Sequence, residues 1–457
     1  MRLRGTGRRT AASMLALVTA GALSLAGCGS SSSDNSSDNA GGGSASAGPC
    51  GTTKPTTLTV GLYGTFGFKE NGVWDAYKKA CPNITIKEDD VEQSADYWTK
   101  LKTRLASGSG LDDVQGIEIG FVGDVVQNHA NQFVNWNKVA NAAADKAEFY
   151  DWKWSMASTA DGSDTVGLGT DTGPQTMCYR SDLFKQAGLP TDTATLTKDF
   201  STWDGYLALG KQYEASTTKP ANSHFVDTVN SIFNAAVYQG TEAYDNTSNQ
   251  PDVEKSDGVK NAWSIATQAA QDKLSAGLTQ WVPDWNKAFS SGTFATVACP
   301  AWMMGYIQGQ AGDAGSGKWA VAPVMPGGAS NWGGSWLGVP TASKNQPAAI
   351  ALVEWLSNKA NQVTMWTAKA QGGHWPSNQQ AAADPSVGQA TSAYFGNAPV
   401  GKIYGQIAGS MKIPPIGQFD TQIQSLINAQ LTNVETKGTS PDSAWSAALD
   451  AVKQVTG

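Results

Sequence analysis

An alternation of strand and helix patterns near the start of the folded region constrains the fold most. Leu58, Val60 and Leu62 alternate with small or polar residues, which is the period of a strand. The following segments read in turn as helix, strand, helix and strand: residues 74–81, 84–86, 97–108 and 114–119. Strands that alternate with helices form parallel sheets that helices cover. The sequence therefore predicts an α/β fold.

The same mixture continues to the end of the chain. Further strands are expected at residues 176–179, 293–299 and 336–339, and further helices at residues 182–187, 258–271, from 347 onward and from 441 onward. Ser440 and Pro441 are a typical helix start, with the serine as N-cap. About 400 residues with these patterns exceed what one hydrophobic core usually supports, so we expect two lobes.

The first 28 residues resemble a bacterial lipoprotein leader. Four arginines precede an apolar stretch at residues 11–25, which is too short for a comfortable transmembrane helix. The stretch ends in Leu25-Ala26-Gly27-Cys28, so we expect a signal peptide at residues 1–27 and an acylated Cys28. Residues 28–55, rich in Ser, Gly and Ala, would be a flexible tether. The chain would then be anchored by lipid on the extracytoplasmic face of the cell membrane; an ordinary signal peptide is the alternative, and the export route stays open.

Charge and cysteine content narrow the class of protein further. Without residues 1–27 the chain has 28 basic and 39 acidic side chains, a net charge of −11, which argues against nucleic acid as a partner. With Cys28 lipidated, four cysteines remain, and an even number in an oxidising compartment suggests two disulfides. Three pairings are possible, and we expect Cys50–Cys81 and Cys178–Cys299.

No cofactor or metal is expected. Only three histidines and no CxxC pair occur, which makes a zinc site improbable. Residues 312–318, GDAGSGK, match part of a phosphate-binding loop, but Trp319 stands where a hydroxyl should bind magnesium.

Four longer stretches carry a resemblance to a known family. They are TLTVGLYGTFGF at residues 57–68, GLGTDTGPQTMCYRSDLFKQAGLP at 167–190, FSSGTFATVACPAWM at 289–303 and GGSWLGVPTASKNQPAAIALVEWLS at 333–357. The chain resembles the extracellular sugar-binding components of bacterial ABC importers, the group typified by maltose-binding protein. The resemblance implies a two-lobe, periplasmic-binding-protein-like fold of type II, with a hinge and an interlobe cleft. Lobe 1 would hold residues 57–168 plus 325–372 and lobe 2 residues 179–320 plus 377–457, with a hinge crossing at 169–174.

The expected ligand contacts are aromatic and acidic residues in that cleft. The chain has 17 tryptophans against 13 phenylalanines and 12 tyrosines, and an indole plane suits the apolar face of a sugar ring, while carboxylates suit its hydroxyls. The candidates are Trp302, Trp332, Trp336, Asp171, Glu118, Thr65 and Phe66. The alternatives are a core role for Trp302, a turn-capping role for Asp171 and a solvated face for Glu118. Four weaker candidates, for which burial in the core is favoured, are Trp281, Trp285, Tyr238 and Trp375.

The predicted function is capture of a carbohydrate, an oligosaccharide, outside the membrane and its delivery to the permease subunits of an ABC transporter. The protein would act as a monomer and would make or break no covalent bond. Two alternatives stay open: a protein of the same fold that binds another polar solute, and a secreted glycosidase. The lack of an obvious arginine clamp disfavours the first, and no pair of acids can be singled out from sequence for the second.

Overall fold

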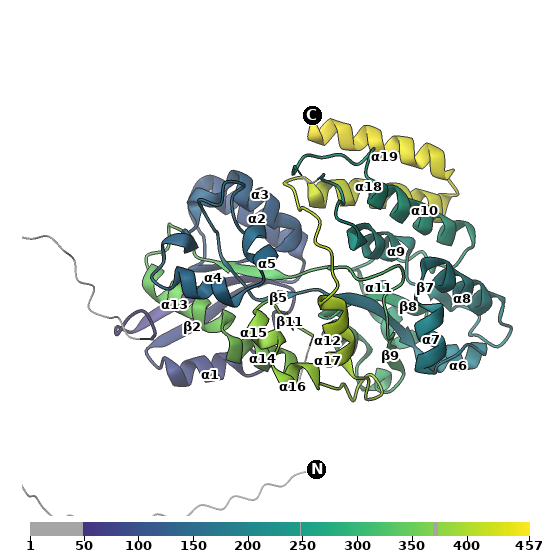
Figure 1. Cartoon of the computed structure of the whole chain (residues 1–457), viewed down its shortest axis with the longest axis horizontal. Helices are drawn as coiled ribbons and strands as arrows, with labels where there is room; N and C mark the ends of the chain where they lie inside the picture. Colours follow the sequence, from purple (N-terminus) through teal and green to yellow (C-terminus); the bar gives the residue numbers. More distant parts are fainter. Residues whose placement is uncertain (1–48, 247, 369–372) are drawn as a thin grey trace, which may run out of the picture. The chain divides into compact units, whose positions relative to one another are not determined.

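The computed structural model describes residues 49–246, 248–368 and 373–457 (Figure 1). Cys28, the expected signal peptide and most of the expected tether lie outside the described residues, so those expectations remain predictions. Within the described part, no helix is long and apolar enough to cross a membrane.

The first sheet contains the strands that the opening pattern predicted. Its order is β2-β1-β3-β10-β4, with β1 parallel to both β2 and β3. β10 runs antiparallel to its neighbours β3 and β4. The strand bounds are β1 Thr56–Tyr63, β2 Ile84–Val91, β3 Val114–Glu118, β4 Leu168–Gly169 and β10 Ser335–Gly338. The predicted parallel α/β arrangement is confirmed here, and one late strand closes the sheet in the opposite direction.

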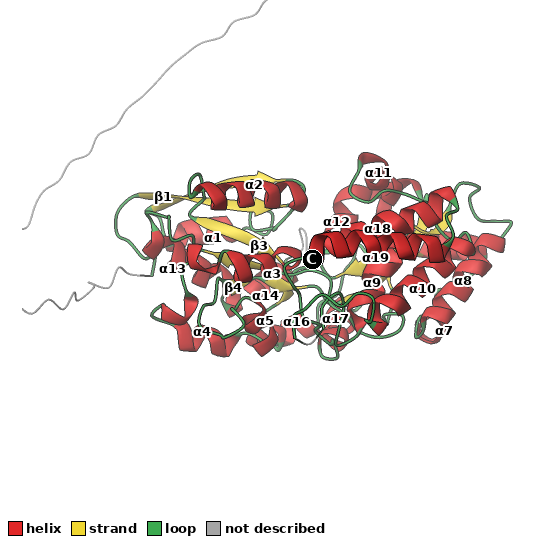
Figure 2. Ribbon diagram, turned by 90° about the horizontal axis from the view of Figure 1, so that it is seen from above, coloured by secondary structure: helices red, strands yellow, loops and turns green. Residues whose placement is uncertain are grey.

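Helices cover both faces of this sheet, as Figures 1 and 2 show. On one face Leu58 and Val60 of β1 join a core with residues of α1 (Val73–Ala80) and α13 (Gln346–Ser357). On the other face Ile117 of β3 joins a core with α2 (Ser94–Ser107) and α3 (Ile119–Asn128). Burial on both faces explains why β3 has no exposed residue.

The second sheet has the order β7-β8-β6-β9. β6 is antiparallel to β8 and β9, while β7 and β8 are parallel. The bounds are β6 Gln175–Arg180, β7 His224–Val226, β8 Phe294–Pro300 and β9 Trp319–Val321. One core contains α9 (Val229–Ala236), α10 (Asp257–Gln271), α18 (Asp420–Lys437) and α19 (Pro441–Thr456), which Figure 1 shows stacked on one side. A separate core contains α11 (Pro283–Ser291), α12 (Met303–Ala311) and α17 (Val400–Ala408).

The remaining helices lie around these cores. They are α4 Ala142–Glu148, α5 Asp151–Met156, α6 Ser181–Ala187, α7 Thr193–Asp199, α8 Trp203–Ala215, α14 Lys359–Thr367, α15 Gln379–Ala382 and α16 Pro385–Gly388, with short 3-10 turns η1 Ala130–Gln132, η2 Trp136–Lys138, η3 Val237–Gln239 and η4 Asp313–Gly315. The expected start of the last helix is confirmed, since the Ser440 side chain accepts a hydrogen bond from the Ser443 amide.

A third sheet has two strands, one from the connection between the two larger sheets and one from later in the chain. β5 (Asp171–Thr172) pairs antiparallel with β11 (Trp375–Pro376), so that Trp375 faces Thr172 and Pro376 faces Asp171. β5 follows β4 of the first sheet and precedes β6 of the second, within the expected hinge at residues 169–174. The lobe boundaries themselves stay a prediction.

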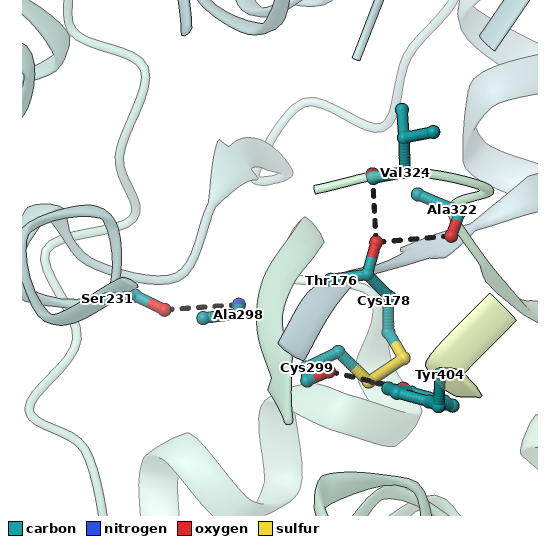
Figure 3. The surroundings of a disulfide bond; sticks show 8 residues. All are labelled: Thr176, Cys178, Ser231, Ala298, Cys299, Ala322, Val324 and Tyr404. Carbon is teal, nitrogen blue, oxygen red and sulfur yellow. Dashed lines mark hydrogen bonds between the residues drawn. A yellow bond between two sulfur atoms is a disulfide. The ribbon is translucent and has the colours of Figure 1, made fainter. Parts of the chain in front are cut away.

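Both expected disulfides are present. Cys50 and Cys81 are bonded with a Cα–Cα distance of 5.7 Å, and Cys178 and Cys299 with 5.3 Å. The second bond links β6 to β8 and is fully buried, and the Tyr404 hydroxyl donates to the Cys299 carbonyl oxygen beside it (Figure 3). The prediction of these two pairs is confirmed.

Candidate functional site

One large cavity of about 750 Å³ lies among the loops and helices that join the two sheets. Its size falls in the range of about 300–1,000 Å³ that is usual for small-molecule sites. Six of the seven residues expected to contact a ligand line it: Thr65, Phe66, Glu118, Asp171, Trp302 and Trp332. Several come from the ends of strands, where ligands of α/β proteins usually bind: Thr65 and Phe66 follow β1, Glu118 ends β3 and Trp302 follows β8.

Trp336 is the exception among the expected contacts. It lies in β10, is 1% exposed and belongs to the core with α2 and α3, outside the cavity lining. Its indole N–H donates to the Lys153 carbonyl oxygen at 3.1 Å, and the Lys153 ammonium lies 3.3 Å from the ring centroid. Successive strand residues point to opposite faces, and the neighbour Ser335 is the one that lines the cavity. We therefore leave Trp336 out of the site.

Four aromatic residues, Trp281, Trp302, Tyr306 and Trp332, form what we call the aromatic wall of the cavity. The Trp302 ring lies 6.0 Å from Trp281, at an interplanar angle of 30°, and 5.8 Å from Trp332, nearly edge-on. The Trp302 indole N–H donates to the Trp332 carbonyl oxygen at 2.8 Å. The polar edge of Trp302 is thus already satisfied within the protein.

The two glycines after Trp332 leave space that side chains of the protein itself occupy. A Cβ atom on Gly333 would lie 2.3 Å from the indole nitrogen of Trp302, and one on Gly334 would lie 2.9 Å from the Lys153 ammonium. Both glycines have positive φ angles, 112° and 110°, which side chains rarely adopt. Their smallness therefore places the Trp302 ring on the cavity wall.

Trp281 lies at the cavity, a position that sequence reasoning did not favour. Core burial was expected, but the residue is only half-buried and lines the cavity. Its backbone has a φ of 68°, in the left-handed region that bulky residues avoid. Strained backbone of this kind gathers at ligand clamps and active sites. Among the other weaker candidates, Trp285 and Trp375 lie in the core as expected, while Tyr238 is buried but borders the cavity.

Asp171 holds the segment between the sheets in place at the edge of the cavity. One carboxylate oxygen accepts hydrogen bonds from the Ser335 amide and the Thr170 hydroxyl, both at 2.9 Å. The other lies 3.7 Å from a ring nitrogen of His374. Burial alone would raise the pKa of Asp171, but the interactions with His374 and the charge of Lys153 outweigh it and hold that pKa below its usual value.

Two further charged groups lie near Asp171: Glu118, which also lines the cavity, and Lys153. Burial raises the pKa of Glu118 to about 7, and one oxygen of its carboxyl accepts from the Gly120 amide at the start of α3. Burial lowers the pKa of Lys153 to about 7, although Asp171 and Glu118 favour its charged form. Lys153 itself lies behind Gly334, outside the lining. None of the described lining residues is a lysine or an arginine, so the cavity offers no full positive charge to an anionic ligand.

Polar residues of α9 and α18 line the side of the cavity formed by those helices. They are Asn230, Asn234, Asp420, Gln424 and Asn428, and we call them the polar wall. The Tyr238 hydroxyl donates to Asp420 at 2.8 Å. Sequence reasoning selected none of the five, because polar residues on two helices almost 200 positions apart give no local signal.

Comparison with known proteins places the chain in a family. Residues 73–394 match the model of a family described as bacterial extracellular solute-binding protein. A lactose-binding protein of Rhizobium radiobacter is 27% identical over 289 residues, which are 60% of this chain and 65% of the relative. An arabinooligosaccharide-binding protein of Halalkalibacterium halodurans is 23% identical over 58% of this chain and 59% of the relative. The chain thus spans slightly less than two thirds of the length of these curated relatives.

Solved structures agree over a larger part of the chain. A crystal structure described as extracellular solute-binding protein family 1 is 35% identical, with a TM-score of 0.75, and the match covers 88% of this chain and all of that one. An ABC transporter associated binding protein from B. animalis subsp. lactis Bl-04, in complex with β-1,6-galactobiose, has a TM-score of 0.71 at 20% identity and shares the fold. The predicted two-lobe α/β fold of type II is confirmed. The chain belongs to the bacterial extracellular solute-binding proteins.

Proposed function

We propose that this protein captures a carbohydrate outside the membrane and delivers it to the permease of an ABC transporter. The observation that carries the proposal is the composition of one cavity: the aromatic wall offers ring faces, and the polar wall offers amides and a carboxyl. Flat indoles suit the apolar face of a sugar, and neutral acceptors suit its hydroxyls. The relatives named for lactose and for arabinooligosaccharides support the same class of ligand.

The same cavity disfavours the alternative of an anionic solute. No described lining residue is a lysine or an arginine, and Glu118 and Asp171 border the space. An anion would lose its hydration without gaining a charged partner, which is costly. A neutral polyhydroxylated ligand meets no such penalty.

The test is calorimetric titration of the protein with a panel of neutral sugars and charged solutes. The panel contains lactose, β-1,6-galactobiose, maltose, an arabino-oligosaccharide, galactose, glutamate and a dipeptide. We expect at least one neutral saccharide to bind with a dissociation constant of order micromolar, roughly −8 kcal/mol, and to be recovered unchanged after long incubation. Heat only with glutamate or the dipeptide would refute the carbohydrate assignment, and cleavage of the sugar would favour a glycosidase.

The lipid anchor is part of the proposal. Acylation of Cys28 would hold the chain, as a monomer, on the extracytoplasmic face of the membrane beside its permease. Cys28→Ser should abolish labelling by radioactive palmitate and release the protein or leave it unprocessed. Equal labelling of the variant would contradict the anchor without touching the ligand assignment.

A further inference from the structure

The polar wall comes from two helices that pack directly against each other. Asn230 and Asn234 are four residues apart on α9, and Asp420, Gln424 and Asn428 are spaced by four on α18. Residues four apart share one helix face, so each helix presents a continuous polar row. α9 and α18 contact each other in the core that they share. The two rows therefore line the cavity from rigid, well-packed elements.

Four acceptor oxygens of this wall lack a donor. The Oδ1 atoms of Asn230, Asn234, Asn428 and Asp420 are all shielded from solvent, and none has a hydrogen-bond partner among the described residues. Buried polar atoms in folded proteins are nearly always paired, because an unpaired one costs free energy. All four belong to side chains that line the same cavity, so we look for their partner in a group that arrives from outside the chain.

The orientation of one amide is fixed by its neighbours. The Thr432 hydroxyl donates to the Asn428 carbonyl oxygen at 2.9 Å, so its hydrogen is already used. The Thr432 hydroxyl oxygen can then only accept a hydrogen bond, and its partner is the Asn230 amide nitrogen, which lies 3.1 Å away. The free atom of Asn230 is therefore the oxygen. For Asp420, one oxygen accepts from the Tyr238 hydroxyl and the other is the free one.

We infer that the polar wall is a hydroxyl-reading subsite, which accepts hydrogen bonds from a neutral saccharide and discriminates it from sugar acids and sugar phosphates. This inference rests on the proposed function and deepens it. The free oxygens of the three amides require hydrogen-bond donors from the ligand. A carboxylate or phosphate brings only acceptors, and the described lining gives it no lysine or arginine.

A charged amine ligand fits this wall less well than a sugar. Burial raises the pKa of Asp420 well above its usual value, with the charges of Asp245 and Glu118 acting in the same direction. A neutral carboxyl at Asp420 removes the counter-charge that an ammonium group would need, and its free oxygen then carries the proton and can donate to the oxygen of a sugar hydroxyl. The three asparagine oxygens are neutral as well, so hydroxyl groups are the best match.

The test uses Asn234→Leu and Asn428→Leu, which remove a free oxygen while keeping the side-chain size. Two control variants are matched to them. Asn433→Leu changes the same helix outside the lining, where the amide is bonded to Gln430. Asn378→Leu removes a fully buried amide that makes hydrogen bonds to Glu148, Gln380 and Ala381.

Two measurements are made on each full-length protein. Titration with the neutral panel sugar that binds wild type should show at least a tenfold loss of affinity for Asn234→Leu and Asn428→Leu, and none for Asn433→Leu. The thermal midpoint without sugar should stay or rise for the two wall variants, because an unpaired group is removed, and should fall for Asn378→Leu. Wild-type protein should not bind digalacturonate.

Three outcomes would overturn the inference. They are wild-type affinity in both wall variants, a fall of their thermal midpoints like that of Asn378→Leu, or digalacturonate that binds as tightly as the neutral sugar. Failure of the proposed function looks different, because wild type itself would then bind no panel saccharide. In that event the thermal midpoints of the unliganded variants still decide whether the wall is incomplete in the free protein.

Discussion

The aromatic wall and the polar wall bound the same cavity, but they are built in opposite ways. The aromatic wall stands mainly on turns and loops: Trp302 follows β8 and Trp281 lies in a strained turn before α11, while Tyr306 alone lies in a helix, α12. Its key polar group is already bonded, since the Trp302 indole donates to a backbone oxygen. The polar wall stands on α9 and α18 and keeps four acceptors unpaired. The difference suggests that ring faces supply general affinity, while the helices select the ligand.

The largest effect is expected from removal of the Cys178–Cys299 bond, which links β6 to the strand that leads into Trp302. The double variant Cys178→Ala/Cys299→Ala should lose about 2–5 kcal/mol of the free energy of unfolding. Urea denaturation measures this, and Cys50→Ala/Cys81→Ala is the control. Its bond closes a shorter loop, 31 against 121 residues, so its loss should be about 1 kcal/mol smaller. A larger loss in the control would contradict the entropic argument.

Trp302→Ala tests the aromatic wall directly. The change removes a ring face from the cavity, and loss of a central aromatic anchor typically costs roughly 2 kcal/mol, or about thirtyfold in affinity. Calorimetric titration with the bound panel sugar measures the effect. Trp445→Ala removes an indole that packs against Trp263, outside the cavity, and should bind as wild type does. Unchanged affinity in Trp302→Ala would leave the polar wall as the main source of binding energy.

Glu118 acts electrostatically on the polar wall through Asp420 and on Asp171 at the edge of the cavity. Burial raises its pKa from 4.5 to about 7, so between these values the folded state holds a proton that the unfolded state releases. Its contribution to stability is therefore present below pH 4.5 and is lost as the pH rises through about 7. Relative to Glu118→Gln, wild type should lose roughly 1–2 kcal/mol over this window, allowing for partial exposure.

Urea denaturation of wild type and Glu118→Gln at a series of pH values measures that difference. Parallel pH profiles for the two proteins would show that Glu118 does not titrate in this window. In that case the Glu118 carboxylate is ionised beside Lys153 at every pH in the series.

The smallest effect concerns the strained turn at Trp281. Trp281→Ala and Trp281→Gly both remove the ring, so both should weaken sugar binding alike. Glycine adopts a positive φ without penalty, and Trp281→Gly should therefore be more stable than Trp281→Ala by about 1 kcal/mol. Thermal denaturation compares the two variants. Equal stability would mean that the turn changes its conformation once the ring is gone.

Sequence reasoning placed residues at the cavity where their position depends on the local pattern, and their contact with a ligand stays a prediction. Glu118 and Trp302 follow directly from strand ends, and both line the cavity. Trp336 was expected at the cavity because glycines lie next to it, but glycines do not reveal which face of a strand a residue occupies. Side chains alternate between the two faces of β10, and Trp336 points into the core. Asn234 and Asn428 gave no signal, since their proximity depends on the packing of α9 on α18. The positive φ of Trp281 likewise follows from the tertiary structure.

The order of the cysteines along the chain has a consequence for how the protein is made. Cys50 is bonded to the next described cysteine, Cys81, and Cys178 to the next after that, Cys299. A chain that emerges N-terminus first into an oxidising compartment exposes each partner in turn, so oxidation of neighbours as they appear produces both native bonds. Neither bond has to be opened again to reach the final pairing. With this order of pairing, a thiol oxidase that joins cysteines as they emerge would produce both native bonds without a thiol–disulfide isomerase.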